Sequence, residues 1–326
     1  LGYSSMAKSH SLDQSFLNFS AKLGSDPLQV QGAGGNTSIK TGKTMWIKAS
    51  GKELSNAQND NIFVQIDLDA AKAAAFGKGD GSCKDTVMDS SVKLRPSIET
   101  TFHAILDWPV VVHTHSVATL VHAISPTGLS VAEKKLEGLP YTIIPYIKPG
   151  IPLTRLILKA ANPKTQIFVL KNHGLICCGQ TVLQVANLVE EVEKRLFMAE
   201  RFSPSINLNT PITADYTISE ESWISNDLNA LAIVRAGSYY PDHVVFLGPG
   251  LPEKPDEKRP AFLVQNVGVY VKSDATKSQK AMLQCLSNIL LRLPSKWKPE
   301  PIGTSAEAEI MNWDAEKYRQ SLSLKS

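Results

Sequence analysis

The chain has 326 residues, of which 43% are hydrophobic and 20% are charged. These shares are close to those of globular proteins, so we expect a complete hydrophobic core and no extensive disorder. The formal net charge is only +3 and no block of Lys and Arg occurs, which argues against a nucleic-acid-binding protein. No apolar run approaches the roughly 20 residues that cross a bilayer, which argues against a membrane protein.

The N-terminal residues and the cysteines bear on cellular location. Residues 1–10 contain no hydrophobic core of the kind found in signal peptides. The four cysteines form neither a CxxC pair nor a disulfide framework, and the adjacent Cys177 and Cys178 are typical of small buried residues. We therefore expect a cytoplasmic protein.

The first part of the chain shows alternating helical and strand patterns. Apolar spacing predicts helices at residues 11–24, 97–108, 116–125 and 181–202. β-branched and apolar runs predict strands at residues 44–48, 62–66, 110–112, 167–170 and 175–178. Thr181 and Gln184 have the spacing of a capping-box pair at the start of the last helix.

A change in composition at residues 203–216, rich in Ser, Asn, Pro and Thr, indicates a linker. Beyond it we expect helices at residues 220–236, 277–293 and 313–322, a strand at residues 244–247 and a hairpin at residues 262–271. Thr217 and Glu220 are a possible cap for the first of these helices. The pattern predicts two parts, residues 1–204 and a smaller α+β extension at residues 205–326 whose role the sequence does not indicate.

Two histidines follow the predicted strand at residues 110–112. Side chains alternate along a strand, so His113 and His115 project to the same side, about 6–7 Å apart along the backbone. Both imidazoles can therefore converge on one ion. The alternative is a pair of hydrogen-bonded polar histidines at a strand end.

A third histidine, His173, lies at a bend between two short predicted strands and precedes Gly174. It is either an ordinary loop residue or a side chain that reaches into a cleft. Three neutral imidazoles with an open fourth position are what a catalytic zinc site needs. Together with His113 and His115, His173 predicts a Zn²⁺ site, although another divalent metal could bind the same ligands.

Glu99 precedes the first of these histidines by fourteen residues. Ser97 could cap the helix predicted there, which would place Glu99 in its first turn, where the helix dipole favours a carboxylate. The functional alternative is a base near the metal that removes a proton beside a polarised carbonyl. His103, one helical turn further on, is expected to be structural.

Two glycine-containing segments have the chemistry of anion sites. Backbone N–H groups can approach an anion closely in Gly34-Gly35-Asn36-Thr37-Ser38 and in Ala49-Ser50-Gly51, and the polar side chains add donors. Neither segment fits a P-loop or a GxGxxG motif. Taken alone, each segment is better explained by the glycines of a tight turn.

Five motifs occur in a fixed order in residues 11–202: Gly35-Asn36-Thr37-Ser38, Ala49-Ser50-Gly51, Pro96-Ser97-Ile98-Glu99, His113-Thr114-His115 and Asn172-His173-Gly174. The ordered set resembles the class II aldolase/adducin family. The resemblance implies a three-layer α/β/α domain around a mainly antiparallel central sheet. It further implies zinc held by three histidines and homo-oligomers, tetramers or dimers, with active sites at subunit interfaces.

The resemblance also implies roles for individual residues. His113, His115 and His173 match the zinc ligands, and Glu99 matches the acid/base carboxylate. The substrate phosphate of the sugar-phosphate aldolases rests on positions that match Gly35, Asn36, Ser50, Gly51 and Ser97. One departure concerns the phosphate, because fuculose-phosphate aldolase-like members carry Ser-Ser where this chain has Ser97-Ile98. A weaker similarity links Asp242-His243-Val244-Val245 and residues 313–322 to the longer rhamnose-utilisation aldolases.

The implied activity is that of a class II, metal-dependent aldehyde-lyase. Such an enzyme cleaves or forms a C–C bond of a ketose or ketose phosphate through a metal-stabilised enediolate. The same chemistry serves sugar-acid phosphate decarboxylases and 4-epimerases, although ribulose-phosphate 4-epimerases typically have Asp where this chain has Glu99. The non-enzymatic alternative is an adducin-like scaffold, which would be expected to lack the metal ligands.

Overall fold

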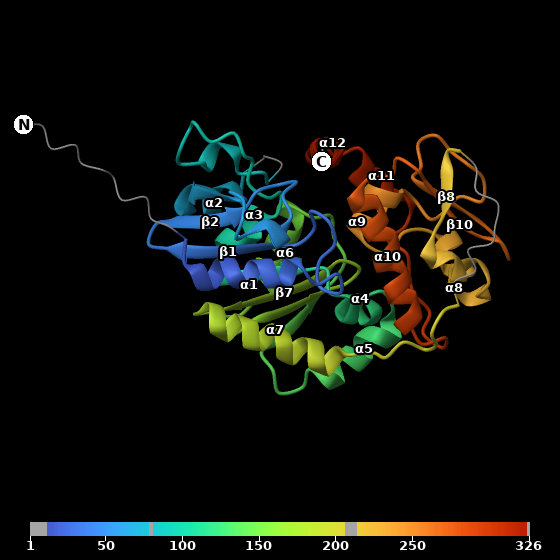
Figure 1. Cartoon of the computed structure of the whole chain (residues 1–326). Coiled ribbons are helices and arrows are strands. Elements are labelled where there is room, and N and C mark those ends of the chain that lie inside the picture. Colours follow the sequence, from blue (N-terminus) through green and yellow to red (C-terminus); the bar gives the residue numbers. More distant parts are fainter. Residues whose placement is uncertain (1–11, 78–80, 206–213, 325–326) are drawn as a thin grey trace, which may run out of the picture.

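The computed structural model describes residues 12–77, 81–205 and 214–324. The predicted start of the first helix at residue 11, the N-terminal residues 1–10 and most of the predicted linker at residues 203–216 lie outside these ranges. Figure 1 shows a large sheet with helices on both sides and, beside it, the C-terminal extension.

A seven-stranded sheet forms the centre of the first part within the described residues, in the order β3-β2-β1-β4-β7-β6-β5. Neighbouring strands are antiparallel except for the parallel pair β5 and β6. The strands are β1 (Asn36–Thr41), β2 (Thr44–Lys48), β3 (Phe63–Asp67), β4 (Val110–Thr114), β5 (Tyr141–Ile144), β6 (Ile167–Leu170) and β7 (Gly174–Gly179). The expected mainly antiparallel sheet is therefore present.

The central strands are buried on both faces, which explains their β-branched runs. In β4, Val110 and Val112 pack in one cluster with α7, whereas Val111 packs in another with α3 and α6. One face carries α1 (Gln14–Gly24), α4 (Val117–Ala123), α5 (Pro126–Lys135) and α7 (Val182–Leu196). The other carries α2 (Leu68–Ala74), α3 (Thr100–Ile105) and α6 (Ile151–Ala160). This arrangement is the predicted α/β/α layering.

Several helix boundaries differ from the sequence predictions. The helix expected at residues 97–108 is α3, which begins only at Thr100, so Glu99 is its N-cap residue and lies outside the first turn. Ser97 Oγ instead accepts a hydrogen bond from the Glu99 N–H at 3.2 Å. The capping box at α7 is only half formed, since Thr181 caps the helix but the Gln184 side chain accepts from the backbone N–H of Gln180.

The extension contains a second, three-stranded sheet in the order β8-β10-β9 among the described residues. Its strands are β8 (Tyr216–Ile218), β9 (Ala261–Val264) and β10 (Gly268–Lys272), and its α-helices are α8 (Leu228–Ala236), α9 (Pro241–Leu247), α10 (Lys277–Arg292), α11 (Thr304–Met311) and α12 (Asp314–Ser323). Apolar side chains of α4 pack in the same core as those of α8, α9 and α10, and Figure 1 shows α10 beside α4. The division at residues 204 and 205 stays a prediction.

Two sequence predictions for the extension were wrong. Residues 244–247 are part of helix α9, in which Pro241 occupies the first turn, where a fixed φ and a missing N–H cost nothing. The helix expected at residues 220–236 is split into a 3₁₀ helix (Glu220–Ser225), capped by Ser219, and α8, capped by Asp227. Thr217 lies in β8 and caps neither.

In the part of the chain that the structure describes, no helix combines the length and apolarity needed to span a bilayer. All four cysteines lie in the described residues, where they are buried and form no disulfide bond.

Candidate active site

The candidate site lies where β1, β4 and the β6–β7 turn meet. Strand register places Asn36 of β1 directly opposite His113 of β4, and Thr114 of β4 opposite Leu175 of β7. Paired residues in a sheet project to the same face, so Asn36 and His113 share one side of it. The site is thus assembled by pairing of segments that are far apart in the sequence.

The structure brings the three predicted histidines together. The candidate ligand atoms of His113, His115 and His173 all lie within 4.8 Å of one another, and each side chain is buried. The Nε2 atoms of His113 and His115 are 3.2 Å apart, which agrees with the expectation that both project to one side.

The protonation of His113 suits a metal ligand. Its Nδ1 donates to the Leu175 carbonyl at 2.9 Å, so Nε2 faces the cluster without a proton. Burial lowers the pKa of His113 to about 3, which keeps the ring neutral at physiological pH. Neutral imidazole is the form that binds metals. A buried group of three imidazoles therefore fits the donor set of a zinc site.

The β6–β7 turn carries His173 into the cluster through two unusual backbone positions. Asn172 has a left-handed conformation with φ +53°, which Asn tolerates better than most residues. Gly174 follows with φ +157°, and a Cβ atom there would lie only 2.4 Å from the Thr114 carbonyl oxygen. Glycine is therefore required for the turn to approach β4 closely.

The Glu99 carboxylate lies beside the histidines. Its Oε1 is 3.1 Å from His173 Nε2 and its Oε2 is 3.4 Å from His113 Nε2. Burial would raise the pKa of this carboxyl, but the positive charge that His113, His173 and His115 carry when protonated and a hydrogen bond from His173 hold it well below its ordinary value. Glu99 is therefore ionised at neutral pH and available as a proton acceptor.

A hydrogen-bonded chain of side chains holds Glu99 from the opposite side. The Asn36 amide donates to Glu99 Oε2 at 2.8 Å, and the Asn36 carbonyl oxygen lies 2.5 Å from His103 Nε2. His103 must then carry its proton on Nε2 and accept from the Ser38 hydroxyl, 2.7 Å from Nδ1. His103, expected from the sequence to be structural, thus orients Asn36, which orients Glu99.

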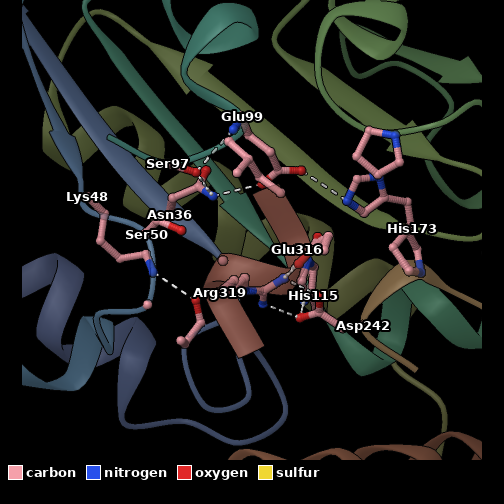
Figure 2. Close-up of a pocket in the computed structure, with 16 residues that line it drawn as sticks. Asn36, Lys48, Ser50, Ser97, Glu99, His115, His173, Asp242, Glu316 and Arg319 are labelled. Atoms are coloured by element: carbon pink, nitrogen blue, oxygen red, sulfur yellow. Dashed lines mark hydrogen bonds and ion pairs between the residues drawn. The ribbon is translucent and has the colours of Figure 1, made fainter. Parts of the chain in front are cut away.

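The residues predicted to bind phosphate line one pocket with Glu99, His115 and His173. The Asn36 amide donates a hydrogen bond to the Ser97 hydroxyl at 3.2 Å. All five residues of the predicted phosphate site line this pocket: Gly35, Asn36, Ser50, Gly51 and Ser97. Figure 2 shows Asn36, Ser50 and Ser97 on the same side of the pocket as Lys48. The structure thus gathers all the predicted site residues, while their roles stay predictions.

Lys48 is a pocket residue that the sequence analysis missed. Its ammonium group is buried and donates to the carbonyl oxygens of Ala33 and Lys52 at 2.8 and 2.5 Å. Burial lowers the pKa of Lys48 to about 7. Lys48 lines the pocket, and within the described residues no carboxylate forms an ion pair with its ammonium group. The third N–H of a protonated Lys48 remains available to a ligand.

Three charged pocket residues, Asp242, Glu316 and Arg319, come from the extension. Asp242 lies at the start of α9 and the other two lie in α12. Arg319 donates to both oxygens of Asp242 at 2.6 and 2.8 Å, as Figure 2 shows. The only sequence signal for these residues was the likeness of residues 242–245 and 313–322 to longer aldolases, which indicated no role.

Comparison with known proteins identifies the family. The family model described as Class II Aldolase and Adducin N-terminal domain matches residues 18–199, more than half of the chain. The chain belongs to the class II aldolase and adducin family. This finding confirms the resemblance seen in residues 11–202 of the sequence. The matched region contains all three histidines and Glu99 but ends before the extension.

Individual relatives agree with this assignment. The chain is 30% identical over 194 residues to the uncharacterized oxidoreductase YuxG of Bacillus subtilis, a match that covers 53% of this chain and 28% of that protein. The chain thus spans little more than a quarter of YuxG. It is 25% identical over 177 residues to the L-fuculose phosphate aldolase of Methanocaldococcus jannaschii, covering 52% of this chain and 86% of that enzyme.

A solved structure supports the fold. The N-terminal class II aldolase domain of a conserved protein from Thermoplasma acidophilum superposes with a TM-score of 0.51 and 27% identity, covering 60% of this chain and 97% of that domain. The predicted class II aldolase-like fold is thereby confirmed.

Proposed function

We propose that this protein is a zinc-dependent class II aldolase, an aldehyde-lyase that cleaves or forms a C–C bond of a ketose phosphate. One observation carries the proposal. Three buried imidazoles have their ligand atoms within 4.8 Å of one another, and the Glu99 carboxylate lies 3.1 and 3.4 Å from two of them. An adducin-like scaffold has no need for this arrangement.

The residues around the cluster have distinct roles in this proposal. Zinc held by His113, His115 and His173 would supply a Lewis acid that polarises a substrate carbonyl. Glu99 removes or returns the proton at the neighbouring carbon, for which an ionised carboxylate is required. Asn36 donates to Glu99 at 2.8 Å and so fixes the direction of the carboxylate.

We assign the anionic end of the substrate to the part of the pocket that is lined by the predicted phosphate-binding residues and Lys48. Backbone and hydroxyl donors at Gly35, Ser50, Gly51 and Ser97 supply hydrogen bonds, and Lys48 supplies positive charge. Lys48 offsets the donor that is lost because Ile98 replaces a serine. A buried ammonium without a carboxylate partner is costly, and a phosphate would provide that partner. The relationship to an L-fuculose phosphate aldolase supports a phosphorylated substrate.

Metal analysis of purified protein tests the cluster. We expect about one zinc per chain in the wild type and none in His113→Ala. His122→Ala is the matched control, because His122 is also buried but bonds to the Ala118 carbonyl in α4, away from the cluster. Metal-free wild-type protein, or zinc retained by His113→Ala, would contradict the proposal and favour the scaffold.

Proton exchange tests the role of Glu99. In D₂O, zinc-loaded wild type should exchange a proton of dihydroxyacetone phosphate at the carbon beside the carbonyl, followed by NMR. Glu99→Gln should keep its zinc and lose this exchange, because an amide cannot accept the proton. Retained exchange would remove Glu99 from the mechanism.

Product analysis with candidate ketose and oxo-acid phosphates then separates aldolase, decarboxylase and epimerase. The predicted homo-oligomer is checked by light scattering.

A further inference from the structure

The extension reaches the histidine cluster through Asp242. Asp242 Oδ2 lies 3.2 Å from Nδ1 of His115, and both side chains are buried. The other ring nitrogen, Nε2, lies 3.2 Å from Nε2 of His113. His115 therefore turns one nitrogen toward His113 and the other toward Asp242 of the extension, and Figure 2 shows His115 beside Asp242.

Asp242 lies where the Nδ1 atom of His115 requires a hydrogen-bond acceptor. Among the described residues, no hydrogen bond of standard geometry reaches the buried Nδ1 of His115, so Asp242 is the group that faces it. A histidine that binds metal through one nitrogen keeps its proton on the other, and a carboxylate there fixes the ring orientation and strengthens the ligand.

Helix α12 in turn fixes Asp242. Arg319 donates to its two oxygens at 2.6 and 2.8 Å, and Glu316 lies 3.4 Å from the same guanidinium. This two-point contact fixes the direction of the Asp242 carboxylate, so that Oδ2 is placed to accept the proton of His115 Nδ1.

The extension also holds the turn that carries His173. The Asn172 side chain donates to the backbone carbonyls of Tyr239 and Glu300, each at 2.9 Å. Both acceptors belong to the extension. Two of the three histidines are thus supported by residues that follow the family domain in the sequence.

We infer that the C-terminal extension is a positioning element of the active site, in which Asp242 orients His115 as a metal ligand. Asp242 touches the ligand from outside the cluster and is a positioning residue. The inference rests on the proposed function only in requiring that the cluster binds metal.

Zinc affinity of the full chain tests the inference directly. Competition with a chromophoric chelator should show that Asp242→Asn binds zinc about ten- to hundredfold more weakly than the wild type. The absorption bands of Co²⁺-loaded protein should shift as well, because they report ligand geometry. Glu307→Gln is the matched control. Glu307 is a buried carboxylate of the extension that accepts from the Ser238 N–H at 2.9 Å and lies outside the pocket, so this variant should lose stability without losing zinc affinity.

A second variant, Gly34→Ala, keeps the charge of Asp242 but displaces its contact with His115. A Cβ atom at Gly34 would lie 3.0 Å from both Asp242 Oδ2 and His115 Nδ1. Gly34→Ala should therefore also weaken zinc binding. If Asp242→Asn shows no cooperative unfolding in urea, and so is not folded, the zinc affinity of Gly34→Ala tests the inference in its place. Wild-type zinc affinity and wild-type Co²⁺ spectra in the folded variants would overturn the inference while leaving the proposed function intact. A wild type that binds no zinc would overturn both.

Discussion

Replacing Lys48 by Met distinguishes the free-energy cost of burying its charge from the contribution of that charge to anion binding. Burial lowers the pKa of this lysine from 10.5 to about 7, a shift of about 3.5 units that corresponds to about 5 kcal/mol at 1.36 kcal/mol per unit. Met removes this penalty but leaves two buried carbonyls without their donor, at a cost of about 1–3 kcal/mol each. Near pH 6 the two effects nearly cancel, so the free energy of unfolding should change little.

The dependence on pH is the sharper quantity. The folded pKa lies below the unfolded one, so the unfolded chain binds more protons between about pH 7 and pH 10.5. The stability of the wild type relative to Lys48→Met should therefore rise from pH 7 to pH 9 by about 2–3 kcal/mol. Urea unfolding at several pH values measures this difference. Parallel stability curves for the two proteins would refute the assignment of a buried, shifted lysine.

Sulfate binding then tests the use of the charge. Sulfate keeps its charge across this pH range, and loss of one charge-assisted hydrogen bond should weaken its binding about 10- to 100-fold in Lys48→Met. Lys40→Met is the matched control. Lys40 also has a pKa lowered to about 7 by burial and also donates to two carbonyls, but it does not line the pocket. Equal sulfate affinity in wild type and Lys48→Met would show that Lys48 only clamps the backbone.

Two further outcomes are expected. Asn36→Ala removes the donor to Glu99 and leaves His103 Nε2 without its acceptor, so kcat should fall about 10- to 100-fold with zinc content unchanged. Equal kcat in this variant would show that Glu99 needs no such support. Chelation of the metal should lower the melting temperature by several degrees, and zinc at about 100 times its Kd should restore about 2.7 kcal/mol. A melting temperature indifferent to chelator and zinc would exclude a resident metal.

The sequence predicted the parts of the site that depend on local geometry. The alternation of side chains in a strand was enough to place His113 and His115 on one side, and the order of motifs was enough to add His173 and Glu99. The valine run at residues 110–112 predicted β4 because a strand buried on both faces has no polar alternation. These inferences need only a period, a spacing or a motif.

The remaining features depend on contacts between distant segments. Whether Lys48 is a surface residue or a buried cation cannot be read from a strand pattern, because the answer lies in what covers it. The buried Val244-Val245 pair looked like a strand, since β-branched residues are common there, yet Pro241 begins a helix at this place. His103 acquires its role only because the fold brings it to Asn36, which is remote in the sequence.

The shared packing around α4 has a consequence for how this protein is divided. Val117, Leu120, Val121 and Ile124 follow directly on the histidine strand, yet they are buried among side chains of the extension. The family model ends at residue 199, yet this core joins α4, which lies before that residue, to helices that lie after it. The residues that match the family model are therefore fewer than the residues that surround its hydrophobic core, and catalysis would depend on the larger set.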